Sequence, residues 1–146
     1  MRPIYQYHIF DLQGAMIPRM EECMRRIAGA LEAVGLTIRK ETSCQFESPE
    51  AGIDAFTGLW VLAESHAVVH TAPEHEWVEI VVASCRTIDP KLFTLFVKRA
   101  FKPAKIHHKS FEMTPAGERR GQCLRKLPER RQAGGSCDDR ESAGID

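Results

Sequence analysis

One segment in the middle of the chain contains several side chains that can act as nucleophile, base or acid. It includes the hydroxyl of Ser65, the imidazoles of His66, His70 and His75, and the thiol of Cys85. Serine and cysteine become strong nucleophiles when a base lies within hydrogen-bond reach. Histidine is the usual base because its pKa lies near neutral pH. These residue types are compatible with a nucleophile paired with a base, or with a metal centre.

Spacing separates these two possibilities only in part. Residues four apart on a strand point to the same face, so His66 and His70 can converge. Further zinc ligands would have to come from His75, Glu74 or Cys85, which lack the paired spacing of zinc motifs. We therefore expect no metal. A serine nucleophile would lack the GxSxG turn of the hydrolases, and ordinary surface histidines also remain possible at this point.

The bulk composition limits the class of protein. The 146 residues are 43% apolar and 27% charged, which suits one globular domain with a substantial core. Twenty basic and twenty acidic residues cancel, so no net charge favours a nucleic acid or an anionic membrane. No apolar run approaches the roughly 18 residues of a membrane span, and the N-terminus lacks a signal-peptide layout. We expect a cytoplasmic protein whose five cysteines are reduced.

Strands and helices that could position these side chains follow from periodicity. Residues 4–12 are rich in aromatic and β-branched types and predict a first strand. Apolar residues at helical spacing predict a helix within residues 17–36, with Gly35 at its C-terminal cap. A second helix should follow Asp89. This second helix is predicted at residues 90–101. Further strands are predicted at residues 36–46, 57–65, 66–71, 77–85 and 104–113.

This order of elements favours an α+β fold of two layers, an antiparallel sheet with both helices on one face. The other face of the sheet would then be available for a partner sheet. We expect residues 1–113 to form this domain. Residues 114–146 are rich in glycine and charge and poor in apolar side chains, so they are predicted to form a disordered tail.

The chemistry-bearing segment resembles a known signature. Prokaryotic S-adenosylmethionine decarboxylase proenzymes carry a run that reads AESH, three residues, HTWPE, ten residues and Cys. The spacing here matches without a gap from Ala63 to Cys85. Flanking matches extend the resemblance over most of residues 7–113. The matching residues are Glu64, Ser65, His66, His70, Thr71, Pro73, Glu74 and Cys85, with flanking runs HIFDLQG, TG and CRTIDP.

The resemblance implies that the chain cuts itself between Glu64 and Ser65. In this family the serine hydroxyl attacks the preceding carbonyl, His70 assists the β-elimination that follows, and residue 65 becomes a pyruvoyl group. The ketone of that cofactor forms a Schiff base with the substrate amine and supplies the electron sink that decarboxylation needs. Cys85 then returns a proton to the α-carbon. His66 and His75 receive no role.

The expected protein is thus a lyase that decarboxylates S-adenosylmethionine for polyamine (spermidine) biosynthesis. By resemblance, it would act as a homodimer of cleaved protomers packed sheet against sheet in a four-layer αββα assembly. We expect a small-molecule substrate and no nucleic-acid or membrane partner.

Four further positions correspond to supporting residues of the family. Thr57 keeps a hydroxyl where the family uses serine in processing, and Asp11 keeps a carboxylate where the family has glutamate. Glu74 matches the acid that binds the ribose hydroxyls, and Phe46 is a candidate for a stacking aromatic ring. Ala72, in contrast, stands where the family has the tryptophan that stacks on adenine.

Because Ala72 removes that aromatic ring, two alternatives remain open. The same pyruvoyl chemistry could act on ornithine or arginine, which carry no adenine. Alternatively, the chain could be a non-enzymatic binding homologue that keeps the fold, since fold alone does not determine function.

Overall fold

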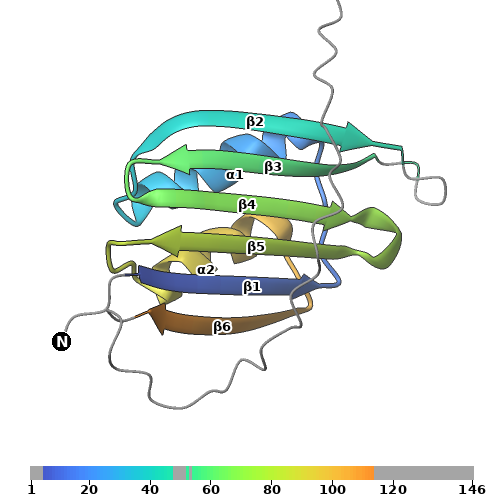
Figure 1. Cartoon of the computed structure of the whole chain (residues 1–146). Helices are drawn as coiled ribbons and strands as arrows, with labels where there is room; N and C mark the ends of the chain where they lie inside the picture. The colour runs from blue at the N-terminus through green and yellow to red at the C-terminus, as the bar shows by residue number, and fades with distance from the viewer. Residues whose placement is uncertain (1–4, 48–51, 53, 114–146) are drawn as a thin grey trace, which may run out of the picture.

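The computed structural model describes residues 5–47, 52 and 54–113, and these form one sheet with two helices on the same face (Figure 1). The elements are β1 (Tyr5–Gln13), α1 (Met20–Ala33), β2 (Ile38–Phe46), β3 (Ala55–Leu62), β4 (Ser65–Ala72), the short 3₁₀ helix η1 (Pro73–His75), β5 (Trp77–Ser84), α2 (Pro90–Phe101) and β6 (Lys105–Met113). All pairs in the order β2-β3-β4-β5-β1-β6 are antiparallel. The predicted α+β architecture is confirmed. The predicted tail, residues 114–146, lies outside the described residues.

Local signals explain where the helices begin and end. The Asp89 carboxylate accepts hydrogen bonds from the backbone N–H groups of Lys91 (2.9 Å) and Leu92 (3.3 Å), which caps the first turn of α2. Pro90 is the first residue of that helix, where its missing N–H costs nothing. The chain leaves α1 through Gly35, whose φ of +88° lies in the region that favours glycine.

The core lies between the sheet and the two helices. Alternate strand residues such as Phe10, Trp60 and Ile80 are completely buried on this side. They pack with Ile27 of α1 and Phe93 of α2, and the rings of Phe10 and Phe93 lie 4.8 Å apart between centroids. Burying a large apolar side chain contributes roughly 1.5–3 kcal/mol, so this layer holds the strands in place.

The opposite side of the sheet, which we call the open face, is also partly apolar. Leu59, Val68, Val81 and Ile9 face one another across β3, β4, β5 and β1, and all four are half-buried. Phe111 on β6 is 52% exposed. An antiparallel sheet whose second face meets only water usually carries polar residues there. This face therefore has the character of a contact surface.

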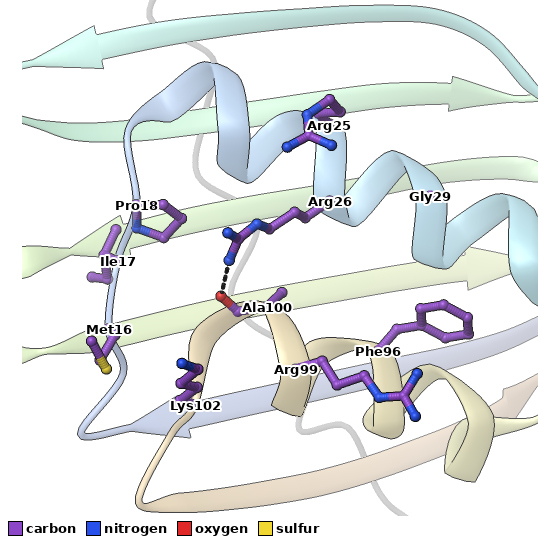
Figure 2. Close-up of a pocket in the computed structure, with 10 residues that line it drawn as sticks. All are labelled: Met16, Ile17, Pro18, Arg25, Arg26, Gly29, Phe96, Arg99, Ala100 and Lys102. Atoms are coloured by element: carbon purple, nitrogen blue, oxygen red, sulfur yellow. Dashed lines mark hydrogen bonds between the residues drawn. The ribbon is translucent and has the colours of Figure 1, made fainter.

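A cavity of about 760 Å³ lies between α1 and α2, on the helix side of the molecule (Figure 2). Arg26, which lines it, donates a hydrogen bond to the Ala100 carbonyl at 2.6 Å, and Arg25, Arg99 and Lys102 also belong to its lining. None of the predicted site residues lines this cavity. Its volume alone therefore does not identify the functional site.

Two histidines link β1 to the edge strand β6 on the helix side. His8 Nδ1 lies 3.0 Å from His108 Nε2, and the two rings stack with centroids 5.2 Å apart. Burial lowers the pKa of both imidazoles, and the charge of His108 lowers the pKa of His8 further. The opposing charge of Glu112 raises the pKa of His8 by a smaller amount. The folded state therefore favours the neutral pair.

We expect this pair to destabilise the fold on mild acidification. Unfolded histidines take up protons near pH 6.5, before the folded pair does. The stabilisation of the folded state by the neutral histidine pair is therefore complete above that pH, and it is lost as the pH falls below it. Urea unfolding at pH 7.5, 6.5 and 5.5 should show a steeper loss of unfolding free energy for the wild type than for His108→Gln. An equal pH dependence of the two proteins would contradict this assignment.

Candidate active site

The predicted cleavage position lies at a strained turn. Ala63 and Glu64 form the two-residue connection between β3 and β4, and Leu62 pairs with Ser65 to close the hairpin. Ser65 has a φ of +153°, which residues with a side chain rarely adopt. Strained backbone of this kind costs about 1–3 kcal/mol and clusters at functional sites. Cleavage before residue 65 would release this constraint.

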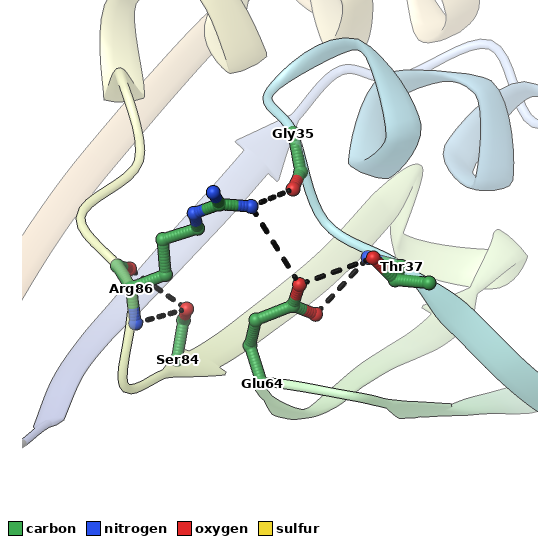
Figure 3. Close-up of polar contacts among 5 residues, drawn as sticks. All are labelled: Gly35, Thr37, Glu64, Ser84 and Arg86. Carbon is green, nitrogen blue, oxygen red and sulfur yellow. Dashed lines mark hydrogen bonds and ion pairs between the residues drawn. The ribbon is translucent and has the colours of Figure 1, made fainter.

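Glu64, on the acyl side of that bond, is anchored by its side chain (Figure 3). Its carboxylate accepts hydrogen bonds from the backbone N–H of Thr37 (3.0 Å) and from the Thr37 hydroxyl (3.2 Å). The hydrogen bond from the Thr37 backbone is the largest cause that lowers the pKa of Glu64. The nearby Arg86 guanidinium, 3.9 Å away, makes a smaller contribution. The side chain is therefore held in place as an anion.

Cys85 lies beside the same peptide group. It directly follows β5, and its backbone N–H donates a hydrogen bond of 3.0 Å to the carbonyl oxygen of Glu64. Ser65 also pairs with Ser84 across β4 and β5. The thiol-bearing residue is exposed. Glu64, Ser65 and Cys85, which the sequence connects only through spacing, are thus neighbours in the fold.

The hydroxyl of Ser65 contacts a histidine to which the sequence assigned no role. Ser65 Oγ lies 2.9 Å from His66 Nδ1. In a regular strand, consecutive side chains point to opposite faces, so adjacency alone does not predict this contact. The unusual φ of Ser65 changes that direction. No sequence signal other than the position of Ser65 at a tight turn could have indicated it.

A second group of polar side chains lies on the open face. Thr57 and His70 face each other across β3 and β4, with Thr57 Oγ1 2.7 Å from His70 Nδ1. Trp77 meets His70 edge to face, with ring centroids 6.2 Å apart, and its indole N–H donates to the Asp11 carboxylate. Glu79 stands between His70 and Asp11 in the strand register.

The two groups are far apart within one chain. Ser65 and His70 are five positions apart on β4, which corresponds to about 16 Å of extended strand. Asp11 lies opposite Glu79 rather than near Ser84, so it belongs to the His70 group. The predicted site residues thus form two groups. Glu64, Ser65 and Cys85 lie at one end of the sheet, and Asp11, Thr57 and His70 lie toward the other end. Phe46, the last residue of β2, and Glu74, which follows β4, also lie at that other end.

Ala72 has an aromatic neighbour. It pairs directly with Trp77 across β4 and β5, and both side chains belong to the open face. Both residues are half-buried. Position 72 therefore carries no ring of its own, but Trp77 on the adjacent strand places an aromatic ring beside it, close to His70.

Within residues 5–47, 52 and 54–113, no group of three or more His, Cys, Asp or Glu side chains is placed to hold a metal ion. His66 contacts Ser65 and His70 contacts Thr57, so these two histidines have different partners. No helix of this described part is long and apolar enough to cross a membrane.

Comparison with known proteins identifies the family. The sequence model of one family, described as S-adenosylmethionine decarboxylase, matches residues 7–113. The chain belongs to the S-adenosylmethionine decarboxylase family. The resemblance predicted from the signature is thereby confirmed, and the match includes every site residue that the signature indicated.

Relatives in the S-adenosylmethionine decarboxylase family agree at modest identity. The S-adenosylmethionine decarboxylase proenzyme of Brevibacillus brevis is 33% identical over 101 residues, which covers 68% of this chain and 72% of that protein. The proenzyme of Aquifex aeolicus is 26% identical over 126 residues, covering 82% and 88%. The crystal structure of the adenosylmethionine decarboxylase from Aquifex aeolicus matches with a TM-score of 0.66 and 26% identity, covering 84% of this chain and 100% of that chain.

Proposed function

We propose that this protein is a pyruvoyl-dependent S-adenosylmethionine decarboxylase that activates itself by cutting the bond between Glu64 and Ser65. The observation that carries the proposal is the strained Ser65, whose preceding carbonyl accepts a hydrogen bond from the Cys85 N–H. The name proenzyme, carried by the curated relatives, supports a processing step. The enzyme would be a cytoplasmic lyase of polyamine (spermidine) biosynthesis, without a nucleic-acid or membrane partner.

Residue 65 is suited to become the cofactor. A pyruvoyl group there would supply the electron sink that decarboxylation of an amino acid needs. The protein's own contribution is placement: Cys85 lies against the same peptide, and its exposed thiol can deliver a proton to a substrate bound at residue 65. Thr57 would hold the imidazole of His70 through the 2.7 Å contact. We assign these functions to residues 1–113, with residues 114–146 as an accessory tail.

We further propose that the complete site needs two chains. His70 lies about 16 Å along β4 from Ser65, too far to act on residue 65 of its own chain. The apolar open face supplies a surface for packing sheet against sheet in a homodimer. If the two-fold axis of this dimer runs across the strands, it brings one end of each sheet to the opposite end of its partner. His70 and Thr57 of one protomer would then complete the site at Ser65 of the other.

A mixing experiment tests this arrangement. Ser65→Ala and His70→Ala should each be inactive alone. Produced together, they should form mixed dimers in which one site has both wild-type residues. Random pairing makes half of the dimers mixed, so about one quarter of the wild-type activity should return. The cut chain should be the His70→Ala chain, identified by mass. Recovery of no activity from verified mixed dimers would contradict a shared site.

The substrate proposal depends on the open face near His70. Trp77, fixed by the hydrogen bond from its indole to Asp11, offers an aromatic ring beside Ala72 for an adenine base. This supports S-adenosylmethionine as the substrate. The neighbouring carboxylates of Glu79 and Asp11 favour a second candidate, since they could bind the distal cation of ornithine or arginine.

Intact-mass analysis and a decarboxylation assay test the proposal together. The purified protein should consist of two fragments, residues 1–64 and residues 65–146, the second with a blocked N-terminus. Labelled carbon dioxide should be released from S-adenosylmethionine. Release from ornithine or arginine alone would support the second candidate. A chain that stays intact and releases none would indicate a binding homologue.

A further inference from the structure

We propose that His66 is the base for the first step of self-cleavage, and that the backbone N–H of Cys85 stabilises the oxyanion formed in that step. This inference rests on the proposed self-cleavage of the Glu64–Ser65 bond. It assigns two groups that the signature resemblance left without a role. Both groups belong to the same chain as the bond that is cut.

His66 is the base within reach of the nucleophile. Its Nδ1 lies 2.9 Å from Ser65 Oγ, which is hydrogen-bond distance. The carboxylate of Glu64 is turned away into contacts with Thr37 and Arg86. His70 of the same chain lies about 16 Å along the strand, and the partner's His70 is assigned to the later elimination step. With the proton of its imidazole on Nε2, His66 can accept the hydroxyl proton at Nδ1.

The step balances without any other reactant. Ser65 Oγ attacks the carbonyl carbon of Glu64 and gives its proton to His66 Nδ1, which forms a C–O bond and a negatively charged oxygen. The C–N bond to residue 65 then breaks, and the departing nitrogen takes the proton back from the imidazolium. The product is an ester between Glu64 and the side chain of Ser65, with a free amine at residue 65. Nothing is oxidised or reduced.

The Cys85 amide is placed to stabilise the charge that develops. It already donates to the Glu64 carbonyl oxygen at 3.0 Å, the atom that becomes the oxyanion. The adjacent turn is fixed because Ser84 Oγ accepts from the Arg86 N–H (2.9 Å) and donates to the Arg86 carbonyl (2.7 Å) (Figure 3). The donor is therefore oriented before the reaction starts.

Ester formation can be measured separately from the later steps. Hydroxylamine cuts an ester but not an amide, so it splits a chain that has completed only the first step. In a His70→Ala background, where elimination is blocked, we expect the ester to accumulate and to be cut by hydroxylamine at residue 64. Adding His66→Asn or His66→Ala should slow ester formation at least about 100-fold, the usual contribution of a general base. His66→Asn keeps a hydrogen-bond acceptor near Oγ but has no basicity.

Controls distinguish chemistry from folding. His75→Asn removes an exposed histidine on η1 and should form the ester at the unchanged rate. Circular dichroism and thermal unfolding should show that His66→Asn is folded.

The possible failures have different meanings. Ester formation at the parental rate in folded His66→Asn would overturn this inference while leaving self-cleavage in place. A wild-type chain that is never cut would overturn the proposed function itself. If His66→Ala does not fold, the His66→Asn result decides between the outcomes.

Discussion

Replacing Ser65 with alanine should leave a single uncut chain with decarboxylase activity at background. The substitution removes the Oγ that we propose as the nucleophile toward the Glu64 carbonyl, and without it residue 65 would have no route to a pyruvoyl group. Alanine should meet the same backbone constraint at residue 65 as serine does, so we expect the fold to persist with a similar thermal midpoint. Intact-mass analysis after long incubation, together with release of labelled carbon dioxide, measures both effects.

A matched control for this loss is Ser110→Ala. Ser110 lies on the exposed part of the edge strand β6, away from the hairpin, so this variant should be cut and active. The result that would refute the assignment is a Ser65→Ala chain that still divides into residues 1–64 and 65–146. Loss of the fold in Ser65→Ala, detected by circular dichroism, would instead indicate that the hydroxyl supports the hairpin.

Replacing Cys85 with alanine should separate processing from turnover. The backbone N–H that contacts the Glu64 carbonyl is retained in Cys85→Ala, so we expect the chain to be cut. The thiol that we propose as the proton donor to the substrate is lost, so kcat should fall by roughly 10²–10⁴-fold, the range for removal of a general acid or base. The KM should change little. Mass analysis reports cutting, and steady-state assays report the two constants.

Cys44→Ser provides the comparison, because Cys44 is the other exposed cysteine in the described part of the chain. This variant should be cut and should turn over substrate as the wild type does. An uncut Cys85→Ala chain would mean that the thiol itself takes part in processing. Unchanged kcat in Cys85→Ala would remove the thiol from the catalytic scheme.

The strands, the helices and the nearness of Ser65 to Cys85 could be predicted from the sequence. Period-two and helical patterns of apolar residues reflect which side of each element faces the core, so they are readable from residue types alone. The tight connection between β3 and β4 places Ser65 at a turn. Because β4 and β5 pair antiparallel, the spacing between Ser65 and Cys85 brings these two residues next to each other.

Three other features of the candidate site depend on backbone details that residue types do not encode. The contact between Ser65 and His66 arises from a backbone angle that serine does not prefer. The distance between Ser65 and His70 follows from the straight course of β4, while their nearness in sequence suggests the opposite. Similarly, Trp77 becomes relevant to Ala72 only through the strand register.

The strand order has a consequence for the proteins that cleavage would produce. Residues before the cut supply β1, α1, β2 and β3, while residues after it supply β4, β5, α2 and β6. Since β1 lies between β5 and β6, a strand of the first fragment is inserted within the sheet of the second. The two fragments are therefore interleaved, and they separate only if the β3–β4, β5–β1 and β1–β6 pairings all break. Unfolding of the mature protein would also be a dissociation, so its apparent stability would rise with protein concentration.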